Sequence, residues 1–475
     1  MKQHEVNRES ISRGNNKKQR AIIFGAGNNF IYSANLLHAM YTIVGIADNA
    51  PARQGTELFG IQIKSLSETM ELPFDVVIVT PSDNTVMMEQ LHTYKELHNR
   101  IMGLEEALSI DKDRKQHIRI AVIMYGGMGD FLIGKNWLHL LARHTVLEKK
   151  CIDIYVSSKD MVTAQVVYGD SELIEGVQEI NEQLPELLEE DGYDLVFRFS
   201  IFPMVQFMKD KRLAEKAPLL FDYATELRKF GMLYYNKGFF ASPDFCRTVK
   251  ALFCRQPDKQ YHTHFDVLDN LGADDTTVCP MEIRREEEAY LSMIGIKRNR
   301  YITINTGVNA EYREKTSTRI WALEKWDALA ERLKEKFPQQ KIVQIGLKRA
   351  EKDNIKADIR LNGATDLEEI KILMKNAWMH FDYDSGLVHL RHMLRGGTSV
   401  VLMGALSVEK HHYQENIAVR ADVCEACEWK TKDWMTNCPR GFREPSCMQA
   451  ITPDMVMEAV SVHLRRYEMT HKICV

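Results

Sequence analysis

Short apolar runs alternate with longer amphipathic stretches along almost the whole chain, and this alternation constrains the fold more than any other feature. It is typical of strand-helix-strand units whose strands form a parallel sheet. The charged stretch SIDKDRKQH and a polar segment at 296–299 interrupt the pattern, and a new apolar run follows each interruption. The sequence therefore predicts three α/β blocks. The predicted strands are residues 20–24, 41–47, 74–80, 118–124, 151–156, 195–199, 301–305, 341–345, 378–382 and 399–404.

These interruptions also set the predicted domain boundaries. Residues 1–17 are polar and nearly free of apolar periodicity, so we expect a flexible tail. An N-terminal Rossmann-like module is expected at 18–112, followed by α/β domains at 117–296 and 298–475. The length of 475 residues suits two or three domains and not a single core.

Composition excludes several classes of protein. The net charge of −4 is too balanced for a chain whose main partner is bulk nucleic acid. No apolar run approaches the roughly eighteen residues that would span a bilayer, and the first residues lack the apolar core of a signal peptide, so we expect a cytoplasmic protein. In such a compartment the nine cysteines indicate reduced thiols or a metal site.

The first block carries a glycine turn of the kind that approaches phosphates. Gly25 and Gly27 follow the first predicted strand, and Asp48 ends the second, where an acid can hold ribose hydroxyls. Phe30 stands where a third glycine would allow close helix packing. The stretch IIFGAGNNFIYSANLL and the residues after it resemble small Rossmann-like modules that precede sugar-modifying enzymes in bacterial surface-glycan pathways. Two interpretations remain, a nucleotide site at Gly25, Gly27 and Asp48 or a docking module with an empty pocket.

Two further turns indicate chemistry at the carboxyl ends of strands. Gly127-Met128-Gly129-Asp130 joins a buried strand to an amphipathic helix, which presents an acid and several amides where ligands bind in parallel folds. Asp384-Ser385-Gly386 begins a helix after a later strand, and free amides at a helix start suit a diphosphate.

Taken in order, these motifs resemble glycosyltransferase family 9, the heptosyltransferases, over about residues 118–466. Further landmarks are YHTHFDVLDNLGAD, INTGVNAEYREKTSTRIWALEKWDALAERL and CMQAITPDMV. The resemblance implies two facing Rossmann-like domains of the GT-B type, an acceptor side and a donor side, with the active site between them. With the N-terminal module, the predicted class is α/β with three such domains.

The resemblance also implies roles for single residues. Asp130 matches the proposed general base, and Arg319 stands where the family usually has a lysine beside the donor diphosphate. Two alternatives remain, because Asp130 could serve only as a helix cap and His389 as a packed core residue. Lys348 stands where relatives often place an acid that meets the donor ribose, which leaves the nucleotide open. The implied donor-binding residues are Gly127, Gly129, Arg319, Lys348, Asp384, Ser385, Gly386, Leu387 and His389.

A cysteine cluster is the last strong signal. Cys424, Cys427, Cys438 and Cys447 lie in one short, turn-rich stretch, and four thiolates can close a tetrahedral sphere around zinc or iron. The stretch VCEACEWKTKDWMTNCP resembles the cysteine finger of the autotransporter heptosyltransferases, which implies structural iron or zinc. The alternative is a set of unligated loop thiols.

The sequence thus predicts an inverting glycosyltransferase without a catalytic metal, with a nucleotide-sugar donor (ADP-heptose by resemblance) and a surface glycan or protein acceptor. The alternatives are another nucleotide sugar, or a non-catalytic sugar-nucleotide-binding or scaffold protein on the same fold. No nucleic-acid partner is expected. Peripheral association with the inner membrane and homo-oligomerisation are both compatible with this prediction.

Overall fold

The computed structural model describes residues 18–81, 85–94, 97, 100–104, 107, 117–180, 192–234, 249, 254, 256–274, 276–307, 318–347 and 354–472. The chain divides into two compact units, residues 1–117 and 118–475. Each unit is described by itself below. The predicted tail, residues 1–17, lies outside the described residues.

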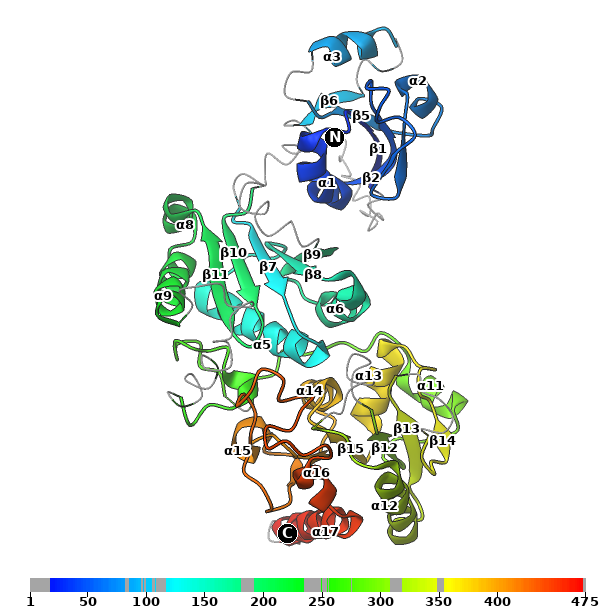
Figure 1. Ribbon diagram of the computed structural model, residues 1–475, viewed down its shortest axis with the longest axis vertical. Coiled ribbons are helices and arrows are strands. Elements are labelled where there is room, and N and C mark those ends of the chain that lie inside the picture. The colour runs from blue at the N-terminus through cyan, green and yellow to red at the C-terminus, as the bar shows by residue number, and fades with distance from the viewer. Residues whose placement is uncertain are drawn as a thin grey trace, which may run out of the picture. The chain divides into compact units, whose positions relative to one another are not determined.

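The first unit is a mostly parallel sheet with helices beside it (Figure 1). Its strands are β1 (Gln19–Phe24), β2 (Tyr41–Ala47), β3 (Glu57–Leu58), β4 (Ile61–Lys64), β5 (Val76–Val79) and β6 (Ile101–Gly103), and its helices include α1 (Asn28–Met40), α2 (Leu66–Thr69) and α3 (Thr85–His92). The strand order is β3-β4-β2-β1-β5-β6. Neighbouring strands are parallel except β3 and β4.

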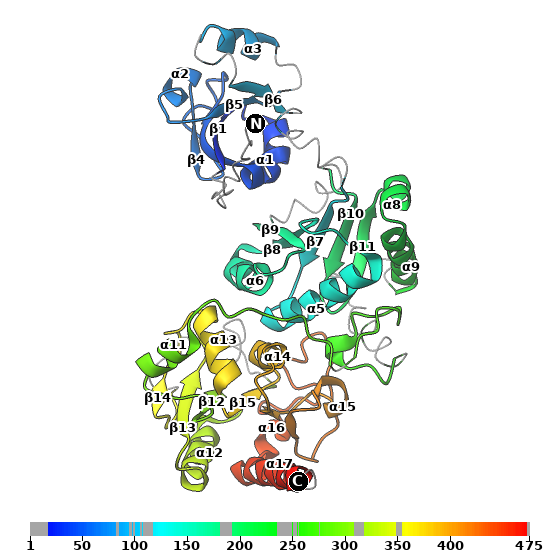
Figure 2. The same ribbon diagram turned by 180° about the vertical axis from the view of Figure 1, so that it is seen from behind.

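The second unit contains two sheets, which Figures 1 and 2 show from opposite sides. The first sheet has the order β11-β10-β7-β8-β9, in which only β11 is antiparallel to its neighbour. Its elements are β7 (Ile120–Met124), α5 (Met128–Thr145), β8 (Ile152–Val156), α6 (Met161–Tyr168), β9 (Ile174–Glu179), β10 (Leu195–Phe199), β11 (Pro203–Met208), α8 (Asp210–Lys216) and α9 (Pro218–Tyr234).

The second sheet of this unit is parallel throughout, in the order β14-β13-β12-β15-β16-β17. Helix α17 lies beside α12 and β17, so its described part packs on the C-terminal sheet. The elements are α11 (Glu287–Met293), β12 (Tyr301–Asn305), α12 (Leu323–Lys336), β13 (Lys341–Ile345), β14 (Ile359–Arg360), α13 (Leu367–Asn376), β15 (Met379–Tyr383), α14 (Gly386–Met393), β16 (Ser399–Leu402), α15 (Val408–His411), β17 (Ile417–Val419), α16 (Ser446–Ala450) and α17 (Pro453–Lys472).

Burial explains why these runs form central strands. Every residue of β7, β8, β12 and β15 is buried, as expected for parallel strands covered on both faces. Helix α12 buries Trp326, Leu329 and Leu333 on one stripe and leaves charged residues outside. Each sheet reverses its order beside its first strand, between β1 and β5, β7 and β10, and β12 and β15. The loops after these strands therefore lie at the switch points where parallel sheets bind ligands.

The predicted fold class, α/β with three sheets that are mostly parallel, is confirmed. The predicted strands all appear, with ends shifted by up to two residues. The strands that were not predicted are β3, β4, β6, β9, β11, β14 and β17. Among the described residues, no helix is both long and apolar enough to cross a membrane.

A buried ion pair joins α5 to the end of α6. Lys135 and Asp170 are in contact, and their side chains are 3% and 4% exposed. Removal of one partner leaves the other charge buried without compensation, so Asp170→Ala should lower the free energy of unfolding by about 3–5 kcal/mol. Urea denaturation followed by circular dichroism measures this change.

The control is Glu172→Ala, which breaks the neighbouring ion pair with Lys149. Those side chains are 73% and 71% exposed, so this variant should lose less than about 1 kcal/mol. Equal losses in the two variants would contradict the role of burial.

Candidate active site

Asp130 lies in the first turn of α5, at the switch point of its sheet. The N-cap of α5 is Gly127, and the Gly127 amide donates a hydrogen bond of 2.8 Å to Oδ2 of Asp130. The Tyr261 hydroxyl donates to Oδ1 at 3.3 Å from the short 3₁₀ helix η3 (Tyr261–Thr263). A Cβ at Gly126, where φ is +112°, would lie 2.2 Å from Oδ2, so only glycine fits there. The turn thus holds this carboxyl group in one place.

Burial raises the pKa of Asp130 to about 6, and the nearby Asp384 adds to the rise, while the Gly127 amide and Tyr261 act in the opposite direction. Asp130 does satisfy a backbone amide at the helix start, as the capping interpretation requires. The hydrogen bond from the amide lowers the pKa of this carboxyl group and burial raises it, and burial has the larger effect. A raised pKa near neutral pH is typical of a group that accepts a proton in catalysis.

Ser385 is the N-cap of α14, the helix that begins at the corresponding point of the C-terminal sheet. Its Oγ accepts from the Leu387 amide at 3.1 Å and donates to the fully buried Asp382. Asp382 also accepts from Asn305 at 2.9 Å. Asp384, Ser385 and the start of α14 are therefore fixed by a buried polar network.

Arg319 reaches the same loop from a distant part of the chain. Its Nη1 donates to the backbone oxygen of Asp384 at 3.0 Å and lies 3.8 Å from the Asp384 carboxylate. Its Nη2 lies 2.8 Å from Sδ of Met435, and the guanidinium lies 5.8 Å from the ring centroid of Trp434. With a side chain 22% exposed, Arg319 is a positioned cation that keeps some access to solvent.

Two glycines allow α5 and α14 to meet at their starts. A Cβ on Gly129 would lie 2.7 Å from Cδ2 of His389 and 3.6 Å from the Cα of Gly386. A Cβ on Gly386 would lie 2.9 Å from Cε of Met128. These glycines were predicted to contact the donor, and the structure shows that they permit the approach of the two helices. Gly127 has open space around its Cα.

Two neutral histidines border Asp384. His389 Nε2 and His411 Nδ1 lie 4.0 and 3.8 Å from its carboxylate oxygens. Burial lowers the pKa of each imidazole to about 4. His389 also bonds to the Tyr413 hydroxyl at 2.6 Å, and His411 stacks on Tyr261 with 4.9 Å between ring centroids. His389 is thus a buried and hydrogen-bonded residue that also borders the site.

The cysteine finger, residues 424–447, follows β17 and ends in α16. Burial raises the pKa of Cys427 to about 11, and the thiols of Cys447, Cys424 and Cys438 add to this rise, so the four lie within electrostatic reach of one another. Arg440 Nη1 lies 3.4 Å from Sγ of Cys424. Among the described side chains, no group of three or more His, Cys, Asp or Glu residues is arranged to hold an ion. Four thiols are the set of ligands that zinc and iron prefer, so the residue types fit such an ion.

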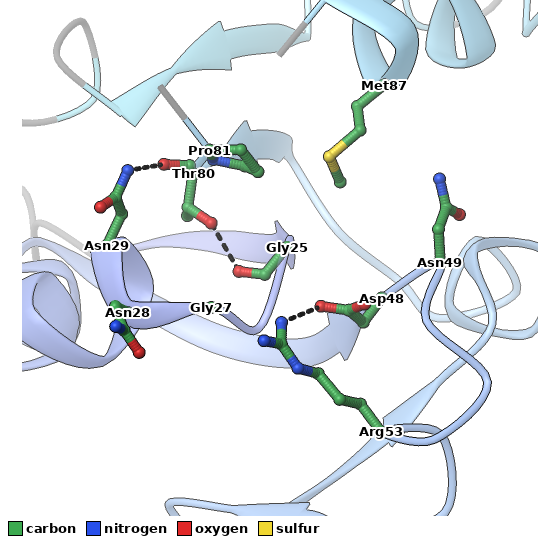
Figure 3. Close-up of a pocket in the computed structure, with 10 residues that line it drawn as sticks. All are labelled: Gly25, Gly27, Asn28, Asn29, Asp48, Asn49, Arg53, Thr80, Pro81 and Met87. Carbon is green, nitrogen blue, oxygen red and sulfur yellow. Dashed lines mark hydrogen bonds and ion pairs between the residues drawn. The ribbon is translucent and has the colours of Figure 1, made fainter. Parts of the chain in front are cut away.

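The N-terminal turn opens into a pocket of about 360 Å³, shown in Figure 3. Gly25, Gly27 and Asp48 all line it, as predicted, and Arg53 joins them. Phe30, which replaces the third glycine of the dinucleotide pattern, is fully buried and packs edge-on against Phe59 with 5.7 Å between ring centroids.

The structure brings most of the predicted residues of the second unit together around the starts of α5 and α14. Lys348 lies outside the described residues. The amide of Leu387 donates a hydrogen bond to Oγ of Ser385. Its partly buried side chain packs against the hydrophobic cluster that includes the core of the first sheet. Sequence reasoning missed Tyr261, His411 and Trp434 as neighbours of the site. Tyr261 and Trp434 had a signal, because Tyr261 begins the landmark YHTHFDVLDNLGAD and Trp434 lies in the stretch VCEACEWKTKDWMTNCP.

Comparison with known proteins adds the following. Residues 17–104 match the family described as C2185-like, N-terminal. No curated protein matches the chain.

Among solved structures, the chain is similar to ADP-heptose lps heptosyltransferase II of E. coli, with 14% identity over 74% of this chain and 100% of that one, at a TM-score of 0.46. It is similar to a glycosyl transferase family 9 protein of Veillonella parvula, with 15% identity, 73% and 98% coverage and a TM-score of 0.48. A third is E. coli heptosyltransferase WaaC with ADP-2-deoxy-2-fluoro heptose, with 14% identity, 73% and 100% coverage and a TM-score of 0.41.

Proposed function

We propose that the second unit is an inverting glycosyltransferase that moves a sugar from a nucleotide-sugar donor to a hydroxyl group. One juxtaposition carries the proposal. Asp130, a carboxyl group with a pKa of about 6 at the start of α5, lies near Asp384, whose loop holds the cation Arg319 at the start of α14. A proton acceptor beside an anion-binding helix start is what direct displacement of a nucleoside diphosphate requires.

The proposed reaction uses these groups in a single step. Asp130 takes the proton of the acceptor hydroxyl as its oxygen attacks the anomeric carbon of the donor sugar. The bond from that carbon to the diphosphate oxygen breaks, and the nucleoside diphosphate leaves with both bonding electrons. Arg319 and the amides at the start of α14 neutralise the charge that develops on the leaving group. Attack from the opposite face inverts the anomeric carbon, and this mechanism needs no catalytic metal.

The motif series that resembles glycosyltransferase family 9 supports a heptose donor carried by ADP. The acceptor is a surface glycan or a protein. Calorimetric titration with ADP-, GDP- and UDP-sugars separates this donor from other nucleotide sugars. A product assay with the donor that binds separates an enzyme from a binding or scaffold protein, since the latter would bind donor and transfer nothing.

The first functional prediction concerns Asp130 as the general base. Deprotonated Asp130 is the active form, so kcat/KM of the natural protein should be full above pH 7 and fall as the pH drops through about 6. Asp130→Asn should lower kcat by about a hundredfold or more at pH 8 and leave donor affinity nearly unchanged.

The matched control is Asp210→Asn, which changes a carboxylate of α8 whose side chain is 54% exposed, and should leave both constants unchanged. Full turnover in Asp130→Asn would remove Asp130 from the mechanism.

The second functional prediction concerns the cation of Arg319. Arg319→Ala removes the positive charge from the leaving-group side, so donor affinity and kcat should both fall, together by about 2–3 kcal/mol. Calorimetry gives the affinity and steady-state kinetics give kcat. Arg332→Ala, which removes an arginine of α12 paired with Asp454, serves as the control. An unchanged donor affinity with unchanged turnover would refute the role of Arg319.

We also propose that Cys424, Cys427, Cys438 and Cys447 bind one structural zinc or iron ion. Their residue types and spacing support this, as do their mutual electrostatic effects. Purified full-length protein should carry about one equivalent of metal, and Cys438→Ser should lower metal content and melting temperature together.

Elemental analysis and thermal melts measure these two effects, with Cys254→Ser, an exposed thiol outside the finger, as the control. Four titratable free thiols in metal-free protein prepared without chelator would end this proposal.

A further inference from the structure

We propose that the pocket of the N-terminal unit binds a nucleotide through its phosphate, with Arg53 as the cation that holds it. This site is separate from the proposed glycosyltransferase site and does not depend on it. The pocket lies at the carboxyl ends of β1, β2 and β5, where the order of the sheet reverses.

The buried carboxylate of Asp48 organises the mouth of this pocket. Oδ2 accepts from the amide of Ala26 at 2.7 Å and from Nη1 of Arg53 at 3.0 Å, and Oδ1 accepts from the amide of Ala50 at 2.8 Å. Asp48 is only 6% exposed, and its carboxylate oxygens bond to the turn and to Arg53. The acid therefore acts as a holder of the cation more than as a free acceptor for ribose hydroxyls.

Arg53 is placed where a phosphate would meet the glycine turn. A Cβ added to Gly27 would lie 3.5 Å from Nη1 of Arg53. Gly27 is the N-cap of the thirteen-residue helix α1. No side chain caps this helix, and its first turn carries no acid. The Arg53 side chain is 49% exposed, so its remaining donors can face a ligand. Guanidinium and backbone amides together match the oxygens of a phosphate.

The opposite wall is closely packed and partly apolar. A Cβ on Gly25, where φ is +107°, would lie 2.7 Å from Cδ of Pro81 and 2.8 Å from Oγ1 of Thr80, so the turn packs directly on the end of β5. Figure 3 shows Pro81 and Met87 across the pocket from Arg53, where a base or sugar ring can lie. The volume of about 360 Å³ is near the lower end of the roughly 300–1,000 Å³ of ligand pockets, which suits a mononucleotide better than a dinucleotide.

The test is calorimetric titration of the full-length protein with AMP and UMP, with adenosine, uridine and inorganic phosphate as contrasting probes. Because the second unit is also proposed to bind nucleotides, all titrations are made in an Arg319→Ala background and repeated in the natural protein. Photolabelling with 8-azido-AMP, followed by peptide mapping, should place the label within residues 18–104. These readouts do not require sugar transfer, so failure of the glycosyltransferase proposal leaves them intact.

Arg53→Ala should weaken nucleotide binding at this site by about tenfold or more. Arg20→Ala is the matched control, because Arg20 also pairs with an aspartate of this unit, Asp75, but does not line the pocket. Asn28→Asp places a carboxylate at the first position of α1, so it should abolish binding while leaving the melting temperature equal or higher. This second variant separates loss of the site from loss of the fold.

Four results would overturn the proposal, and the first three concern the variants, the nucleosides and the photolabel. They are unchanged affinity in both Arg53→Ala and Asn28→Asp, nucleosides that bind as tightly as the nucleotides, and a photolabel found only in the second unit. Inorganic phosphate that binds as tightly as AMP and UMP would also overturn it, because the nucleoside would then contribute nothing.

Discussion

The site of the second unit depends on the close approach of α5 and α14 at their starts. Gly129 and Gly386 allow this approach, since any side chain at either position would collide with the other helix. The contact brings two positive helix ends together, one carrying Asp130 and the other carrying Asp384. The two acids offset the positive charge of these helix ends, and Arg319 lies 3.8 Å from the carboxylate of Asp384. The packing of α5 against α14 therefore decides that the acids of the two helix starts lie close to each other.

The two sheets of the second unit are also joined by aromatic contacts near this point. Tyr261, from the segment that leads out of the first sheet, hydrogen-bonds to Asp130 and stacks on His411 of α15. His262 and His392 lie on the ring of Tyr413, with centroid distances of 4.0 and 3.9 Å. These stacked rings form a largely buried layer that connects Asp130 of one half to the Asp384 loop of the other.

The sequence predicted the fold well because the central strands are continuous buried runs, such as 120–124 and 301–305. The edge strand β9 is mostly half-buried or exposed, and β11 is half-buried along its middle, so their patterns are too weak to identify them. Glycine turns were predicted from local sequence, but their neighbours were not. Tyr261 lies 131 positions from Asp130, and Met435 lies 116 positions from Arg319, so no local rule connects these pairs. The raised pKa of Asp130 likewise follows from burial that only the folded chain creates.

Residues of the cysteine finger pack directly against Arg319 and the residue before it. Thr318 is the residue before Arg319. Its hydroxyl donates to the backbone oxygen of Trp434 at 2.9 Å, and its amide donates to the backbone oxygen of Met435 at 3.1 Å. The ring of Trp434 and the sulfur of Met435 support the guanidinium itself. Oxidation of Met435 to the sulfoxide would insert a polar group under this cation. Mild oxidative damage would therefore disturb the contacts that hold Arg319 beside Asp384, while both sheets of the second unit still gave a native far-ultraviolet spectrum.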